Sequence, residues 1–133
     1  MFEEIGGFIG YVIIVLYALT ILNYFVKLIN KKFREQIKKN VTFHKIFTKV
    51  MRFLIKQHKL FGVLSIAAIL LHFYLQYNRI GLSITGVIAA GVMLLQVLLG
   101  IYGSKMKKRS HVWLIAHRSI AVLLAVTILI HIL

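Results

Sequence analysis

HKLFGVLSIAAILLH at residues 58–72 and HRSIAVLLAVTILIH at residues 117–131 share one pattern. Each stretch begins and ends with a histidine, and the 13 residues between the histidines are mostly apolar. In an α-helix, residues 14 positions apart lie within about 40° of one face and about 21 Å apart along the axis. Each stretch therefore predicts a helix that carries two histidines on one face.

Apolar runs of this kind make up most of the 133-residue chain, which is 60% hydrophobic. A soluble domain has roughly 45–50% apolar residues. Four runs have a length near the roughly 20 residues that an α-helix needs to cross the hydrocarbon layer. They cover about residues 7–26, 54–77, 81–103 and 112–133. The sequence thus predicts one all-α domain over residues 1–133, an integral membrane four-helix bundle.

Composition removes several kinds of chemistry. The chain has no cysteine, and its three acidic residues are Glu3, Glu4 and Glu35. The absence of cysteine excludes disulfides, thiolate metal sites and covalently attached c-type haem. With three carboxylates in the chain, a carboxylate metal site or a catalytic carboxylate pair is not expected. Histidine is the ionisable residue left in quantity inside the apolar runs.

Positive charge is concentrated in two places. Of 17 Lys and Arg residues, eleven lie between Lys27 and Lys59 and four lie within residues 105–109, and the net charge is +14. Both clusters lie between apolar runs, where cytoplasmic loops accumulate Lys and Arg. We expect a multi-pass protein of a plasma or inner membrane, with these loops cytoplasmic and both termini outside. The distribution argues against a nucleic-acid-binding function.

Residues 40–57, between the first and second spans, form a different kind of segment. Aromatic and aliphatic residues recur there at helical spacing, with Lys and Arg between them. This pattern predicts a basic amphipathic helix on an anionic inner leaflet of the bilayer. A cytoplasmic extension of the second span is the alternative.

The four histidines fall at two matched levels. The short link at residues 78–80 makes the second and third spans antiparallel, so the second and fourth spans run in the same direction. His58 and His117 then share the cytoplasmic level, and His72 and His131 share the outer level. Porphyrin iron takes one axial ligand on each side, and imidazole is a suitable one. We therefore predict two b-type haems, ligated by these two pairs.

A structural or proton-handling role is the alternative for the four histidines. Polar groups inside a membrane are energetically costly, so four of them at two matched levels favour a site. His44 also lies 14 residues before His58, but it falls in the basic segment without a matching partner on another span.

Other residues are candidates for contact with the cofactor. Gly86 and Gly100 on the third span are also 14 residues apart, and glycine allows a flat macrocycle to approach the backbone. Ordinary helix packing is the alternative for this pair. Arg118 and Lys59 at the inner level and Arg79 at the outer level are candidate partners of the anionic propionates, although topology alone would also place cations there.

The two histidine spacings and the glycine spacing resemble the dihaem transmembrane cytochromes b, in particular the four-helix core of the cytochrome bc complexes. HKLFG at residues 58–62 and the Trp113-x3-His117-Arg118 pattern are also similar to the ferric-reductase-like transmembrane domain of metalloreductases and NADPH oxidases. The resemblance covers about residues 54–133. It implies a haem-binding bundle that moves electrons.

The expected function is transmembrane electron transfer from a cytoplasmic donor or a membrane quinol to an external acceptor. The chain has no glycine-rich dinucleotide fingerprint, so another protein or a quinol is expected to supply the electrons. One alternative is the membrane domain of a terminal ferric, oxygen or quinone reductase. The other is a non-redox transporter or assembly subunit that contains histidines. No catalytic residue is predicted.

Overall fold

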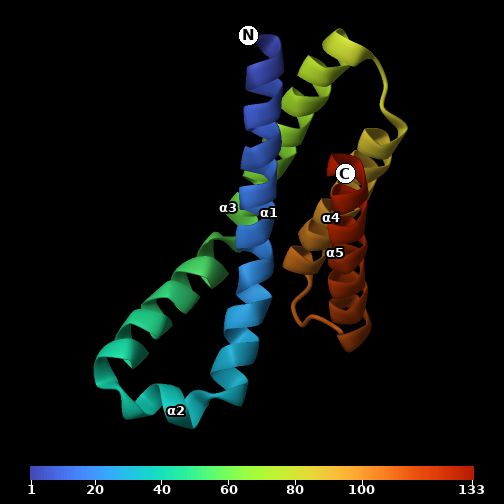
Figure 1. Ribbon diagram of the computed structural model, residues 1–133. Coiled ribbons are helices and arrows are strands. Elements are labelled where there is room, and N and C mark those ends of the chain that lie inside the picture. The colour runs from blue at the N-terminus through green and yellow to red at the C-terminus, as the bar shows by residue number, and fades with distance from the viewer. The chain divides into compact units, whose positions relative to one another are not determined.

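The structure is a computed structural model that describes residues 1–133 apart from the side chain of residue 2 (Figure 1). The chain is 91% helical, and its described residues contain no strand. The helices are α1 (Phe2–Lys32), α2 (Arg34–Lys39), α3 (Val41–Ile80), α4 (Ile84–Lys105) and α5 (His111–Ile132). The predicted all-α fold class is confirmed.

Four of these helices, α1, α3, α4 and α5, are long and apolar enough to cross a membrane. Each predicted span coincides with one of them, so the protein fits an integral multi-pass membrane protein. The third predicted span begins three residues before α4. Gly81 adopts a φ of 78°, which ends α3, and the Ser83 hydroxyl caps α4 by accepting a hydrogen bond from the Gly86 backbone N–H.

The basic amphipathic segment is not a separate helix. Residues 41–57 form the N-terminal part of α3, which continues without a break to Ile80. This is the second of the two predicted arrangements, the extension of the second span. Its physical reason is that the segment contains no glycine and the chain contains no proline, so nothing interrupts the helix there. At about 1.5 Å per residue, α3 is about 60 Å long, twice the about 30 Å hydrocarbon layer.

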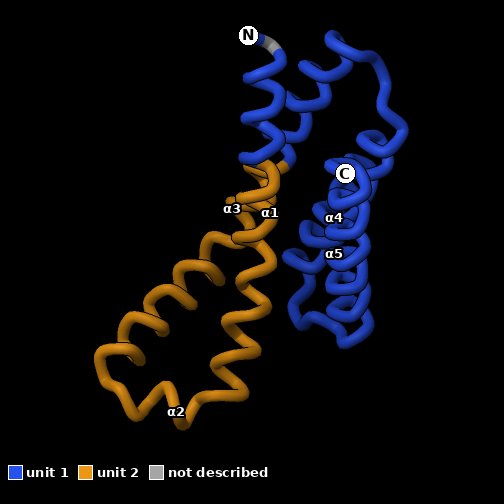
Figure 2. Tube along the Cα trace, viewed as in Figure 1, with its two compact units in different colours: residues 1–12, 66–133 blue, residues 13–65 orange. Residues whose placement is uncertain are grey.

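The chain divides into two compact units (Figure 2). The first unit comprises Met1–Val12 and Ile66–Leu133, and the second unit comprises Ile13–Ser65. The first unit therefore contains the start of α1, the end of α3, and all of α4 and α5. All four membrane-crossing helices contribute to it, and three of the four predicted haem ligands belong to it.

In the first unit, α4 and α5 pack closely as antiparallel neighbours. Met93 of α4 and Leu124 of α5 are buried in the unit. An ion pair of 3.0 Å joins Glu3 of α1 to Arg79 of α3. Most other large apolar side chains of this unit are exposed, as expected for helices whose outer surface contacts lipid.

The second unit consists of the rest of α1, the short α2 and the first part of α3. Ile37 of α2 and Leu54 of α3 are buried within it. The Asn40 side chain caps α3, because its Oδ1 accepts a hydrogen bond of 3.1 Å from the backbone N–H of Phe43. This cap explains why α3 begins directly after α2.

Candidate functional site

Two of the predicted ligands lie close together in the first unit. His72 comes from α3 and His131 comes from α5, and both are half-buried. Their ring centroids are 6.3 Å apart, and their ring planes are inclined by 87°. The structure thus brings together the pair that the sequence assigns to the outer level.

The His72 ring is oriented by α1. Its Nδ1 atom lies 3.1 Å from the carbonyl oxygen of Gly6. Because a carbonyl can only accept, Nδ1 carries the proton and donates it, which leaves the lone pair on Nε2. At Gly10, an added Cβ would lie 3.4 Å from Cε1 of His72. The small residues of α1 therefore allow its backbone to approach the ring closely enough for this hydrogen bond.

The His131 ring is oriented by the start of α4. Its Nδ1 atom lies 3.0 Å from the Thr85 hydroxyl, which lies 3.2 Å from the Ser83 hydroxyl. An added Cβ at Gly86 would lie 3.0 Å from Cε1 of His131. Glycine at this position therefore makes room for the imidazole. A hydroxyl can donate or accept, so Nε2 has a free lone pair in the tautomer whose Nδ1–H donates to Thr85.

This geometry can be compared with the requirement of a haem iron. A metal–imidazole nitrogen bond is about 2 Å, and the ring centroid lies about 1.1 Å behind that nitrogen, so two imidazoles on opposite sides of one metal have centroids about 6 Å apart. The observed 6.3 Å agrees with this separation. Each imidazole can rotate about its metal–nitrogen bond, so inclined ring planes are acceptable. The separation of the two rings is therefore compatible with two imidazoles that share one metal ion.

His117 has a different environment on the same helix. Its ring stacks on the ring of Trp113, with centroids 5.0 Å apart and planes inclined by 12°. The Nε1 of Trp113 donates a hydrogen bond of 2.9 Å to the carbonyl of Leu99. Gly103 lies directly against the Trp113 ring, with no room for a Cβ. The tryptophan is thus fixed against α4, and its ring covers one face of the His117 imidazole.

Gln96 and Gly100 of α4 also approach His117. The side-chain nitrogen of Gln96 lies 3.5 Å from Nε2 of His117, which is a long and weak hydrogen bond. An added Cβ at Gly100 would lie 3.8 Å from Cε1 of His117, an ordinary contact distance. Gly86 thus lies beside His131, and Gly100 lies beside His117. The predicted role of the two glycines beside a macrocycle stays a prediction.

The remaining predicted site residues have less defined roles. His58 is half-buried on α3 in the second unit, so its pairing with His117 stays a prediction. Arg118 is exposed on α5. Arg79, a candidate partner of a propionate, already has Glu3 as its counter-ion.

Three residues beside the histidines were not predicted from the sequence. They are Gly6, which contributes a backbone carbonyl, Thr85, which contributes a hydroxyl, and Gln96, which contributes an amide. Thr85 and Gln96 interrupt an otherwise apolar span, and a polar residue at the level of a histidine is a signal that could have identified them.

Among the described residues there is no cluster of three or more His, Cys, Asp or Glu side chains that could hold a metal ion. The histidines that the structure brings together are a pair, His72 and His131. Comparisons with protein-family models, with curated proteins and with solved structures find no match to this chain.

Proposed function

We propose that the protein is a membrane electron-transfer protein that binds two b-type haems. His72 and His131 would hold one haem, and His58 and His117 would hold the other. The observation that carries the proposal is the His72–His131 pair, with centroids 6.3 Å apart and both Nδ1 atoms engaged by other groups. When bound, haem supplies reversible one-electron transfer.

The residues around the outer pair have distinct tasks in this proposal. The Gly6 carbonyl and the Thr85 hydroxyl fix the ring orientations and present both Nε2 atoms as ligands. Gly10 and Gly86 leave space for the edges of the two rings. The apolar helices exclude water from the rings, which lowers the local dielectric and thereby affects the redox potential.

Support for the inner pair comes mainly from the sequence. His58 precedes His72 by 14 residues, and His117 precedes His131 by the same number. For Nε2 of His117 to become a ligand, the Gln96 side chain has to turn away from it. The proposal therefore includes a local rearrangement at the inner level.

The positive loops bear on which side of the membrane the electron donor and the acceptor lie. If these loops are cytoplasmic, the inner haem faces a cytoplasmic donor protein or a membrane quinol, and the outer haem faces an external acceptor. A carrier of this kind needs no catalytic residue of its own, because its polypeptide binds, orients and insulates the cofactors.

The direct test is a pyridine haemochrome assay on the full chain, purified in detergent and supplied with haemin. We expect two haems per chain and the visible bands of a low-spin bis-histidine b-type haem. His111→Ala is the matched control, because His111 is an exposed residue at the start of α5 and should not affect the haem content. A preparation that stays colourless would refute the proposal and favour a non-redox role. Rapid oxidation of the reduced protein with turnover of ferric chelate, oxygen or quinone would instead identify a terminal reductase.

A further inference from the structure

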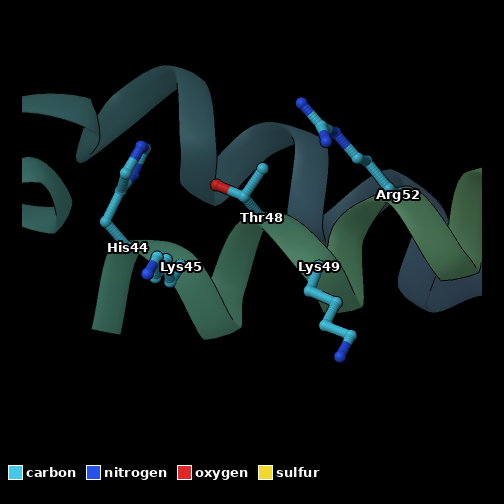
Figure 3. A pocket seen from close by; sticks show the side chains of 5 residues that line it. All are labelled: His44, Lys45, Thr48, Lys49 and Arg52. Atoms are coloured by element: carbon cyan, nitrogen blue, oxygen red, sulfur yellow. The ribbon is translucent and has the colours of Figure 1, made fainter. Parts of the chain in front are cut away.

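The first part of α3 carries a shallow groove of about 370 Å³ that is separate from the histidine pairs. Its lining residues all belong to α3 and are mostly basic: His44, Lys45, Thr48, Lys49 and Arg52 (Figure 3). His44, Thr48 and Arg52 follow one another at four-residue intervals and therefore lie along one line of the helix. Figure 3 shows these three side chains pointing to one side of the helix, whereas Lys49 points away from that side.

The positive charge at this groove needs an external counter-charge. The second unit contains eleven Lys and Arg residues but only one acidic residue, Glu35. Most of its cations therefore have no carboxylate partner within the unit. In addition, the Nδ1 atom of His44 is buried and has no hydrogen-bond partner among the described residues. An anion with oxygen acceptors would supply the missing counter-charge to the exposed Lys and Arg side chains.

The position of the groove along α3 indicates where that anion lies. The apolar span of α3 begins at about residue 54, and the groove occupies residues 44–52 directly before it. Eight residues of helix cover about 12 Å, which exceeds the headgroup layer of about 5–7.5 Å that each leaflet adds to a core of about 30 Å. The groove therefore begins at the headgroups and extends into the adjoining water. The same segment exposes apolar side chains, among them Phe43, Ile46 and Phe53, each at least 50% exposed. These side chains suit the boundary between headgroups and acyl chains.

We propose that this groove binds the phosphate of an anionic membrane lipid. The Arg52 guanidinium can contact two phosphate oxygens at once, and the hydroxyl of Thr48 can donate a hydrogen bond to the phosphate. Lys45 and Lys49 lie one turn apart on the same side of this line and add positive charge beside it. The bound lipid would fasten the extramembrane half of α3 to the membrane surface. This inference is independent of haem binding.

The test measures lipid binding to the full chain in detergent by native mass spectrometry, with phosphatidylglycerol as the anionic probe and phosphatidylcholine as the zwitterionic one. The Lys49→Gln/Arg52→Gln double variant removes two charges from the groove. The matched control is Lys38→Gln/Lys39→Gln, which removes two charges from exposed residues of α2 outside the groove. All four side chains are exposed, so folding should be unaffected.

We expect the groove variant to weaken phosphatidylglycerol binding about 25-fold, since each Lys or Arg near an anionic surface contributes about fivefold. The control variant should weaken it less than threefold, and phosphatidylcholine should bind weakly to every form. Equal losses in the two variants would overturn the proposal, because they would mean attraction by net charge alone. Competition by free glycerophosphate at the same concentration would also overturn it and indicate a site for soluble anions. Unchanged lipid binding in the groove variant would contradict it and favour an acidic protein partner.

Discussion

His131 and His117 lie 14 residues apart on α5, and each faces a glycine of α4, yet their surroundings differ. At His131, the Thr85 hydroxyl engages Nδ1 and leaves Nε2 for a ligand, while His72 faces the ring. At His117, the ring stacks on Trp113, and the Gln96 amide approaches Nε2 itself. The sequence spacing thus places both histidines on the same face of α5. The residues of α4 beside each histidine determine which ring nitrogen can act as a ligand.

This difference has a consequence for cofactor binding. The outer pair has a centroid separation of 6.3 Å, which is compatible with two imidazoles on one metal. The inner level has to release Gln96 from His117 first. We expect the outer site to bind haem more tightly, because a preorganised site loses less free energy in ordering its groups.

The largest expected effect on stability is at Gly103. Gly103→Ala would place a Cβ within the Trp113 ring, so the tryptophan has to move and lose its hydrogen bond to Leu99. We expect a loss of about 3 kcal/mol in the free energy of unfolding, at the upper end of overpacking costs. Thermal unfolding in detergent measures it. Gly91→Ala on the same helix has nothing within 4 Å of the added Cβ and is the control, so equal losses in both variants would contradict the contact.

A second pair of variants separates the outer and inner levels. Gly86→Ala would press on His131 at 3.0 Å, whereas Gly100→Ala would meet His117 at an ordinary 3.8 Å. We expect Gly86→Ala to weaken haem binding at the outer site about 10-fold, within the range seen when groups that support a metal ligand are altered. Haem titration followed by visible absorption measures the effect. If Gly100→Ala were equally damaging, close approach of the macrocycle to α4 would be the better explanation for both glycines.

Thr85→Val tests the hydrogen bond to His131 with little change in volume. When the Nδ1–H of His131 donates to the Thr85 hydroxyl, the imidazole becomes more basic and favours the oxidised iron. Loss of the bond should therefore raise the midpoint potential of one haem, by a shift on the order of tens of millivolts. A redox titration resolves the two haems. A shift in both haems or in neither would argue against this role of Thr85.

The smallest effect is expected for Glu3→Gln, which removes the ion pair with Arg79. The Glu3 side chain is 82% exposed, so solvent and salt screen the interaction. We expect a change of less than about 1 kcal/mol in the free energy of unfolding. Thermal unfolding at low and high salt checks this, and a large effect that does not depend on salt would contradict it.

Much of the fold could be predicted because its determinants are periodic. The apolar runs predict four helices, and the short link at residues 78–80 predicts that the second and third spans are antiparallel. The continuity of α3 through residues 41–57 was harder to predict, since an amphipathic pattern reports the surroundings of a helix rather than where it ends. Only a glycine or proline would have marked a helix end, and residues 41–57 contain neither. The absence of such a residue therefore favoured one continuous helix.

The partners of the histidines were predictable only in part. The carbonyl of Gly6 is a backbone group, so the sequence gives no sign that it accepts a hydrogen bond from His72. The role of Thr85 depends on the rotation of α4 about its axis, and the pattern of apolar residues does not determine this rotation to within one side chain. The same holds for Gln96, because the sequence does not distinguish an amide that faces lipid from one that faces a neighbouring helix.

A haem count in histidine variants tests whether His72 and His131 hold the same haem. The experiment compares the single variants His72→Ala and His131→Ala with the double variant, using the haemochrome assay and circular dichroism to check folding. All three proteins should retain one haem per chain, because each has lost one shared site, and His72→Ala/His117→Ala should retain none. A double variant that loses more haem than either single variant, or single variants that keep both haems, would contradict the pairing.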